Sequence, residues 1–286
     1  MEATQIDAGE FRAGQRRDWG TAAKGWHDWQ ELIYSATAPV SERLVEMAGI
    51  RPGDRVLDVA AGAGEPALTA AKVAGPEGEV VATDISPEML AYGRERASAA
   101  GFDNIEFAEI DASSLDFPPE SFDAALSRWG IIFEPHAEAA AARIRGFLKP
   151  GARIAISSWG PPDRAPMLGL PMRTVLTHLD LSPPPPGTPG PLSRPTPEAI
   201  SSLLDGGGFA DVEVDQLELV FEWDSPEEFA RFTREIVPPI TALMANQPPE
   251  VQEGTWAAVV EAAKPYADTD GRLRLTNLVL LAAGRT

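Results

Sequence analysis

Cysteine is absent from the 286 residues, and histidine occurs only three times. The lack of cysteine excludes disulfides, thiolate nucleophiles and cysteine-ligated metal sites. The histidines, His27, His136 and His178, are too dispersed to form a ligand cluster, so we expect no metal. Basic residues are also scarce, with 24 against 43 acidic residues and a formal net charge of -19. This charge disfavours nucleic acid and anionic membrane surfaces as partners.

Residues 1–25 also lack an apolar stretch. Cations scattered among acids in this region predict neither a secretory signal nor a membrane anchor. We therefore expect a cytoplasmic protein that acts on a small molecule and binds neither nucleic acid nor membrane. A homodimer is one expectation for its assembly. Hydrophobic residues make up 44% of the chain, which is enough to bury a substantial core.

What the sequence does contain is a regular alternation of apolar runs of strand length with helically spaced apolar residues. This alternation predicts a Rossmann-like α/β fold, with helices on both faces of a seven-stranded, mostly parallel sheet. The sheet ends in a pair of strands without a second nucleotide-binding half. The predicted strands are 55–60, 79–83, 105–109, 122–127, 153–158, 211–223 and 272–283, and the predicted helices are 39–48, 66–73, 87–99, 135–147, 167–179, 197–204, 225–245 and 250–263.

Long connecting segments divide the chain into four expected parts. Residues 1–37 form an N-terminal helical lid, and residues 38–160 form the Rossmann-like core that binds the ligand. Residues 161–197, which include SPPPPGTPGP, form a Pro-rich lid insertion. Residues 198–286 complete the sheet and cover the substrate. Because strand-to-helix segments emerge at the carboxyl edge of a parallel sheet, where ligands bind, the long ones predict a roof over a shielded site.

A glycine-rich loop in residues 56–86 predicts an adenosine-containing ligand. Gly62 and Gly64 follow the first strand, where a missing side chain lets the backbone turn and approach a ligand. Pro66 suits the first turn of the next helix. Asp84 ends the second strand, from which a carboxylate can accept two hydrogen bonds from a ribose diol. The loop alone leaves nicotinamide dinucleotides and S-adenosylmethionine both open, because GAGEPA also satisfies G-x-G-x-x-G/A.

The surroundings of the loop favour S-adenosylmethionine. Asp58 lies inside the strand ahead of it, and a helical segment precedes that strand. Here the chain resembles class I S-adenosylmethionine-dependent methyltransferases, most closely the ubiquinone/menaquinone-biosynthesis C-methylase-like (methyltransferase type 11) group. Ala60 stands where many members have glycine, and its methyl group is tolerated if the residue keeps a negative φ. The resemblance covers Ala38 to Trp159 through VLDVAAGAGEPAL, VVATDISPEML, EIDASSLDFPPESFDAALSRWGIIFEP and FLKPGARIAISSW, and extends more weakly through GGGFADVEVDQLEL.

The resemblance implies that S-adenosylmethionine binds at the ends of the first four strands, with S-adenosylhomocysteine as the product. It implies that the backbone of Ala60, Ala61, Gly62 and Gly64 holds the methionine moiety and that Asp58 organises this loop. The further implied contacts are Asp84 to the ribose, Ile85 and Met89 to the adenine face, Asp111 and Ala112 to the adenine amino group, and Ser127 and Trp129 along the channel.

The N-terminal segment is unusually aromatic, with Trp19, Trp26, Trp29 and Tyr34. Helically spaced aromatic residues commonly pack in a core. The resemblance, however, places this segment over the cofactor. We therefore expect these side chains both to pack and to form a lid.

Methyl transfer is an in-line displacement that depends on orientation and water exclusion, so no dedicated catalytic residue is obligatory. If the acceptor must lose a proton, the candidate bases are His27, His136 and His178, with Glu134 and Asp163 as alternatives. The residues expected in a catalytic role are His27, His136 and Arg128. Each histidine is better explained as a solvated or helix-capping residue, and Arg128 has two interpretations, as the partner of a substrate carboxylate or of one of the nearby acids.

These observations predict methyl transfer to a small, apolar or aromatic acceptor in a closed site. A nicotinamide-dependent oxidoreductase and a non-catalytic S-adenosylmethionine-binding protein are the alternatives. The acceptor pocket is expected among apolar residues of the roof, which are Met167, Leu168, Leu170, Phe229, Phe232, Ile236, Leu243 and Met244.

Overall fold

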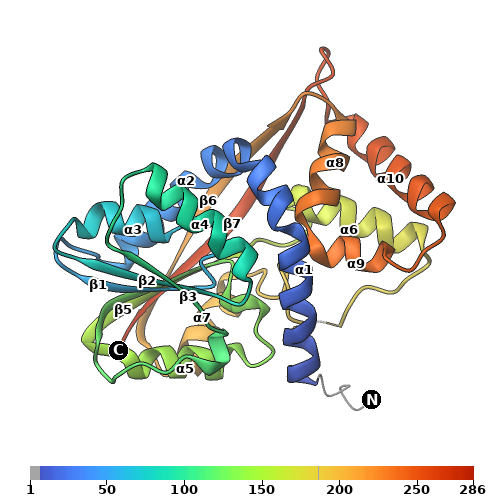
Figure 1. Ribbon diagram of the computed structural model, residues 1–286. Coiled ribbons are helices and arrows are strands. Elements are labelled where there is room, and N and C mark those ends of the chain that lie inside the picture. Colours follow the sequence, from blue (N-terminus) through green and yellow to red (C-terminus); the bar gives the residue numbers. More distant parts are fainter. Residues whose placement is uncertain (1–6, 186) are drawn as a thin grey trace.

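The computed structural model describes residues 7–185 and 187–286. Within these residues a seven-stranded sheet has the order β3-β2-β1-β4-β5-β7-β6 (Figure 1). The strands run parallel except for β7, which is antiparallel to β5 and β6, and this confirms the predicted Rossmann-like, mostly parallel sheet. The strands are β1 (Arg55–Val59), β2 (Glu79–Asp84), β3 (Ile105–Glu109), β4 (Phe122–Arg128), β5 (Leu148–Trp159), β6 (Ala210–Trp223) and β7 (Leu273–Arg285).

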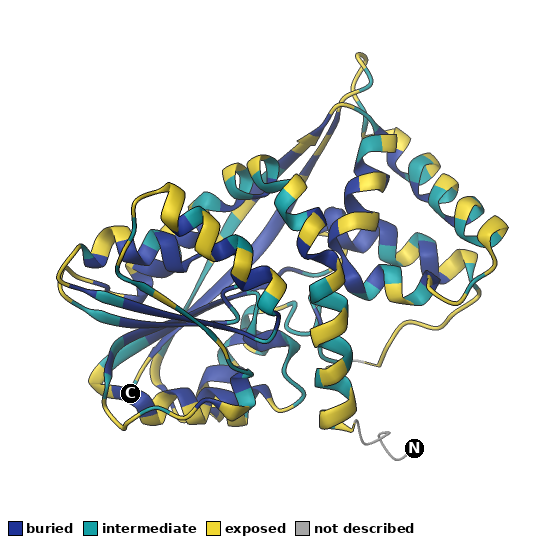
Figure 2. Cartoon of the chain, viewed as in Figure 1, coloured by how far each residue is buried: buried dark blue, intermediate teal, exposed yellow. Residues whose placement is uncertain are grey.

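Helices cover both faces of this sheet, because its strands are apolar on both sides. In β1, Val56 packs in the cluster beneath α2 (Gln30–Ala48) and α3 (Ala67–Ala74), whereas Leu57 packs toward the opposite face. That face is covered by α5 (Ala137–Phe147) and α7 (Pro197–Gly206), while α4 (Pro87–Ala99) lies on the side of α3 (Figure 1). The inner strands β1, β2, β4, β5 and β7 are consequently largely buried, whereas the edge strands β3 and β6 and the outer helix faces are more exposed (Figure 2).

A helical cover packs beside the sheet on the long ends of β6 and β7 (Figure 1). It consists of α6 (Pro166–His178), α8 (Pro226–Ile236), α9 (Pro238–Met244) and α10 (Pro249–Ala263). Trp223 of β6 packs edge-on against Phe229 and Phe232 of α8, with ring centroids 4.9 and 5.2 Å apart. These contacts attach the cover to the sheet at the site of the expected roof.

The N-terminal helices are longer than the sequence indicated. Proline suits a first helical turn, so Pro39 marked a predicted start, but α2 begins at Gln30 with Pro39 inside it. The helix continues upstream because Ile33 and Thr37 extend the buried face of Val40. The expected boundary at residue 37 therefore falls inside α2, and residues 1–6 of the expected lid lie outside the described residues.

Helix α1 (Ala8–Asp28) begins at Asp7, whose side chain accepts hydrogen bonds from the amides of Gly9 and Glu10. It crosses α8 at Gly25, where a Cβ would lie only 2.3 Å from the carbonyl oxygen of Glu235. Glycine is therefore required for this close approach. The contact fixes α1 against the cover.

Two further differences from the sequence interpretation concern element ends. The stretch 225–245 forms two helices rather than one, because Pro238 and Pro239 cannot donate the hydrogen bonds that would continue α8 past Val237. Three short 3₁₀ turns also occur, η1 (Ala112–Ser114), η2 (Ile131–Phe133) and η3 (Lys264–Tyr266). Among the described helices, none combines the length and the apolar character needed to cross a membrane.

Candidate functional site

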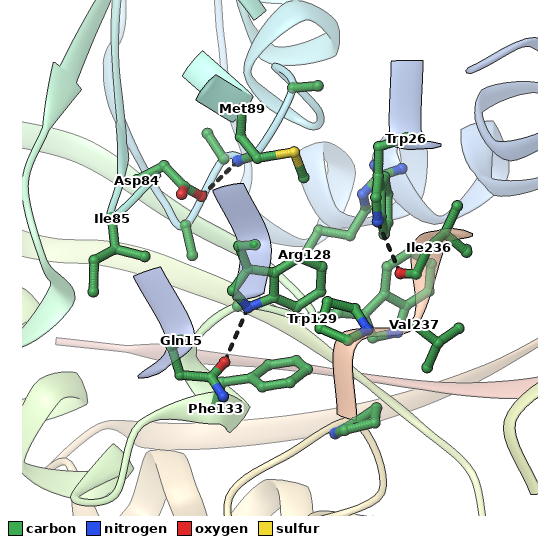
Figure 3. Close-up of a pocket in the computed structure, with 18 of the residues that line it drawn as sticks. Gln15, Trp26, Asp84, Ile85, Met89, Arg128, Trp129, Phe133, Ile236 and Val237 are labelled. Atoms are coloured by element: carbon green, nitrogen blue, oxygen red, sulfur yellow. Dashed lines mark hydrogen bonds between the residues drawn. The ribbon is translucent and has the colours of Figure 1, made fainter. Parts of the chain in front are cut away.

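A cavity opens at the carboxyl edge of the sheet, between the strand ends, the N-terminal helices and the cover (Figure 3). Its floor comes from the segments that follow β1, β2, β3 and β4. Helices α1 and α2 form one wall, and α6, β6, α8 and the start of α9 form the other. The structure thus brings together segments that are more than 200 residues apart in the sequence.

Asp84 lies on the cavity floor at the end of β2, as predicted. Its Oδ2 accepts a hydrogen bond from the backbone N–H of Gly62, and its Oδ1 accepts one from Ser86, each at 2.8 Å. Burial raises the pKa of Asp84 to about 6, although these amides oppose the shift. The carboxylate is therefore ionised at neutral pH and held in one orientation.

Ala60 contradicts the expectation of a negative backbone dihedral, because its φ is +59°. Gly130, just after β4, makes this conformation possible. A Cβ on Gly130 would lie 2.4 Å from the Cβ of Ala60. The methyl group of Ala60 thus occupies the space left free by the glycine. Both residues line the cavity, as do the predicted Ala61 and Gly62.

Three of the predicted cofactor residues support the floor without lining the cavity. Gly64 packs closely against Leu68 and Gly93, so a side chain there would clash. Ser127 donates to the carbonyl oxygen of Val59 and accepts from the amide of Ile131, each at 2.9 Å. Ser127 thereby joins the ends of β1 and β4. The third is Asp58.

Asp58 is fully buried on the side of β1 that faces α3. Neither of its carboxylate oxygens has a hydrogen-bond partner within residues 7–185 and 187–286. Burial raises its pKa to about 8, and the charge of Arg128 opposes the shift only in part. Asp58 is therefore largely protonated at neutral pH.

The adenine-side residues expected from the resemblance, Ile85, Met89, Asp111 and Ala112, all line the cavity. Asp111 also caps η1, since its Oδ1 accepts a hydrogen bond from the amide of Ser113 at 2.7 Å. The capping and cavity-lining interpretations of Asp111 are thus both compatible with its position.

Arg12 is a site residue that the sequence interpretation missed. Its Nε lies 3.6 Å from Oδ1 of Asp111 and 3.5 Å from Oε2 of Glu134, so it links α1 to the segments after β3 and β4. Burial and the neighbouring Asp111 raise the pKa of Glu134, whereas Arg12 opposes this. A signal was present, since Arg12, Gln15 and Trp19 recur at i, i+3 and i+7 along one helix face.

The aromatic N-terminal segment is divided between cavity and rim. Trp19, Trp26 and Tyr34 line the cavity, and the indole N–H of Trp26 donates to the carbonyl oxygen of Ile236 at 3.0 Å (Figure 3). Trp29 is not a lining residue; its indole N–H donates to Glu235 at 2.5 Å, on the exposed side of α8. The hydrogen bonds of Trp26 and Trp29 connect the N-terminal helices to the cover.

The histidines do not occupy the reaction site. His27 stacks on Tyr92, with ring centroids 4.3 Å apart, and His136 precedes α5 without a side-chain capping bond. Neither these residues nor Asp163 is among the described residues that line the cavity, whereas Glu134 is. His27 and His136 are thus not positioned as general bases there.

Arg128 lines the cavity, but within the described ranges it forms no ion pair with an acid, contrary to the simpler interpretation. Its Nη1 donates to Oγ1 of Thr37 at 2.8 Å and to Oγ of Ser41 at 3.1 Å, both neutral hydroxyls of α2. Trp129, the next residue, lines the cavity and stacks on Trp159 with ring centroids 4.5 Å apart. These contacts fix both side chains at the end of β4.

Residues 56–151 match the family described as "Methyltransferase domain". The ubiquinone/menaquinone biosynthesis C-methyltransferase UbiE of Pseudomonas fluorescens is 40% identical over 124 residues, which are 43% of this chain and 48% of that protein. The corresponding protein of Teredinibacter turnerae is 37% identical over 122 residues, 42% of this chain and 49% of that protein. The chain therefore spans about half the length of these curated relatives.

Solved structures share the fold over most of the chain. The YcgJ protein of Bacillus subtilis aligns with a TM-score of 0.56 at 18% identity, covering 86% of this chain and 97% of that one. The [4+2]-cyclase SpnF aligns with a TM-score of 0.54 at 18% identity, covering 93% and 96%. At such identities the likeness concerns architecture alone.

The glycine loop, the acid that ends β2 and the sequence match converge on the same part of the chain. Residues 56–151 of this protein match a methyltransferase domain, and the chain is similar to UbiE C-methyltransferases over 122 to 124 residues.

Proposed function

We propose that the protein transfers a methyl group from S-adenosylmethionine to a small apolar or aromatic acceptor. The single observation that carries this proposal is the buried carboxylate of Asp84, held by the Gly62 amide on the floor of a largely apolar cavity. When bound, S-adenosylmethionine supplies a sulfonium methyl group, whose carbon bonds to the acceptor as the carbon–sulfur bond breaks and its electron pair stays on sulfur.

The residues present fit this cofactor. Gly62 and Ser86 each use one acceptor position of Asp84, and a carboxylate has about four such positions, so it can still accept bonds from a ribose diol. Gly62 has a φ of +54°, and a Cβ there would meet only Met89 Cε at 3.5 Å, so the backbone faces open space. Ile85 and Met89 supply apolar surface for a purine.

The class of acceptor is argued from the cover. The lining residues from α6, β6, α8 and α9 are apolar, which favours a molecule with a flat or aliphatic body. The bond from Trp26 to Ile236 closes this half of the cavity against α1, which supports a reaction shielded from water. The lining residues of this half are Met167, Leu168, Phe221, Phe232, Ile236, Val237, Pro238 and Pro239.

Calorimetry tests the cofactor. We expect S-adenosylmethionine and S-adenosylhomocysteine to bind the folded protein and NADH not to bind. If NADH binds and neither S-adenosylmethionine nor S-adenosylhomocysteine does, the result would instead favour the oxidoreductase alternative.

A second experiment tests the reaction. Purified protein is incubated with methyl-labelled S-adenosylmethionine and a cell extract, and labelled products are identified by mass spectrometry. The expected product is a methylated apolar or aromatic small molecule together with S-adenosylhomocysteine. Binding without turnover would indicate a non-catalytic protein or another reaction, an outcome that fold alone does not exclude, since the similar SpnF is described as a cyclase.

A further inference from the structure

Arg128, a cationic side chain on the cavity wall, forms no ion pair with any residue that the structure describes. Arg128 is only 8% exposed, and Thr37 and Ser41 satisfy its Nη1 alone. Its Nε has no hydrogen-bond acceptor among residues 7–185 and 187–286. Of the acids whose charge acts on Arg128, Glu65 pairs with Arg96 at 3.2 Å, and burial favours the neutral form of Asp58. Buried charges in proteins are normally paired, so this guanidinium is poised for an anion that enters the cavity.

Two neutral hydrogen-bond donors on the cavity wall also lack an acceptor among the described residues. The hydroxyl of Tyr34 and the indole N–H of Trp129 are both buried and have no acceptor in the described part of the chain. Buried polar groups without protein partners are uncommon in native proteins, and several on one cavity wall are typical of a polar binding site. Arg128 and Trp129 are adjacent at the end of β4, and Tyr34 lies close enough to feel the charge of Arg128.

These donors are held in place before any ligand arrives. The guanidinium of Arg96 lies 3.6 Å above the ring of Tyr34. Trp129 stacks on Trp159, and its backbone N–H donates to Oγ of Ser157 at 3.1 Å. A rigid donor set loses little entropy on binding, which favours a specific interaction.

We propose that Arg128, Tyr34 and Trp129 together bind a carboxylate. A carboxylate offers acceptor positions for all three donors, and its bond to guanidinium is charge-assisted. The proposal builds on the proposed function and leaves two sources of this group, the amino-acid end of the cofactor and a carboxylate carried by the acceptor.

The first experiment compares S-adenosylhomocysteine with 5′-methylthioadenosine, which lacks the amino-acid carboxylate. If the cofactor supplies the group, calorimetry will show the wild type preferring S-adenosylhomocysteine, and Arg128→Met will reduce that preference by about tenfold to a hundredfold. Arg43→Met is the matched control, because it removes an arginine of α2 that does not line the cavity and that pairs with Glu46 and Asp215. It should leave the preference in place.

The second experiment tests the acceptor as the source. Phenylacetate is titrated into protein saturated with S-adenosylhomocysteine. If Arg128→Met abolishes this binding and leaves the preference for S-adenosylhomocysteine intact, the carboxylate belongs to the acceptor. If Arg128→Met changes neither measurement, the carboxylate site is overturned.

Folding is checked in parallel. Arg128→Met removes a buried charge that has no ion pair in the described structure, but it also removes the hydrogen bonds to Thr37 and Ser41, so circular dichroism and thermal unfolding must show that the variant is folded before its binding is interpreted. Tyr34→Phe removes only one hydroxyl and provides a second variant, expected to shift the same measurement severalfold in the same direction. A wild type that binds neither nucleoside overturns both proposals, whereas binding with unchanged selectivity in both variants overturns only the carboxylate site.

Discussion

The backbone N–H of Gly62 donates a hydrogen bond to Oδ2 of Asp84 across 2.8 Å, joining the loop after β1 to the end of β2. The same carboxylate accepts a second bond from the Ser86 amide at the start of α4. These bonds orient Asp84 before a ligand arrives and leave acceptor positions toward the cavity. The first prediction concerns this carboxylate.

Asp84→Asn should weaken S-adenosylhomocysteine binding by about 1.5–3 kcal/mol for each charge-assisted bond lost. The amide has the size of the carboxylate but lacks its charge. Calorimetry measures the effect, and circular dichroism checks the fold. Glu109→Gln, at the exposed end of the neighbouring strand β3, is the control and should bind like the wild type. Equal affinity in Asp84→Asn and Glu109→Gln would contradict the assignment.

The affinity should also depend on pH. Since burial raises the pKa of Asp84 to about 6, the carboxylate gains a proton below that pH and loses acceptor capacity. We expect the dissociation constant to rise by up to about tenfold per pH unit below pH 6. Titrations between pH 5 and 8 test this, and in Asp84→Asn the dependence should flatten. A steep dependence that survives in Asp84→Asn would assign it to another group.

Asp58 makes a separate prediction about stability. Its pKa is about 8 in the folded protein and near 3.8 when unfolded, so between these values the folded state binds more protons. Stability should therefore fall as pH rises through this window, by up to about 1.4 kcal/mol per pH unit. Asp58→Asn cannot ionise, so this variant should not lose stability as pH rises through the same window. Its unfolding temperature, relative to the wild type, should increase from pH 5 to 8; a constant difference would contradict the shift.

Ala60→Gly should be neutral or stabilise the protein by up to about 1 kcal/mol. Glycine relieves the left-handed strain of Ala60, which costs about 1–2 kcal/mol, but it also loses more entropy on folding. Ala61→Gly is the matched control. Ala61 has no such strain and is buried, so its substitution should destabilise by about 0.5–1 kcal/mol from backbone entropy. Denaturant unfolding measures the stability of both variants. If Ala60→Gly lowers the free energy of unfolding more than Ala61→Gly does, the strain assigned to Ala60 would be contradicted.

Trp26→Phe should speed the release of S-adenosylhomocysteine. The substitution removes the bond to Ile236, worth about 0.5–1.5 kcal/mol, and loosens α1 from the cover. Stopped-flow dissociation measures the rate. Trp29→Phe breaks a bond on the exposed side of α8, outside the cavity wall, and should change this rate much less. Similar rates in both variants would argue against closure by Trp26.

Local patterns predicted the sheet well, and they placed several candidate residues at the cavity. Helix 87–99 and strand 105–109 were placed at their observed bounds, and Asp84 and Gly62 lie where the loop pattern put them. The backbone of Ala60 was predicted wrongly, because its φ depends on Gly130, seventy residues away in the sequence. His136 was misplaced for a related reason, since a helix-start pattern does not determine which side of the helix faces the cavity.

The amino-acid sequence by itself determined the alternation of strands and helices, the glycine loop and the acid that ends β2. These features arise from periodicity and from residues close together in the chain. Only the tertiary structure decided that Arg12 reaches Asp111 and Glu134, that Trp26 bonds to Ile236, and that Arg128 stays without an anion in the described chain. Such contacts join segments distant in sequence, and their geometry depends on how the whole sheet and its cover pack.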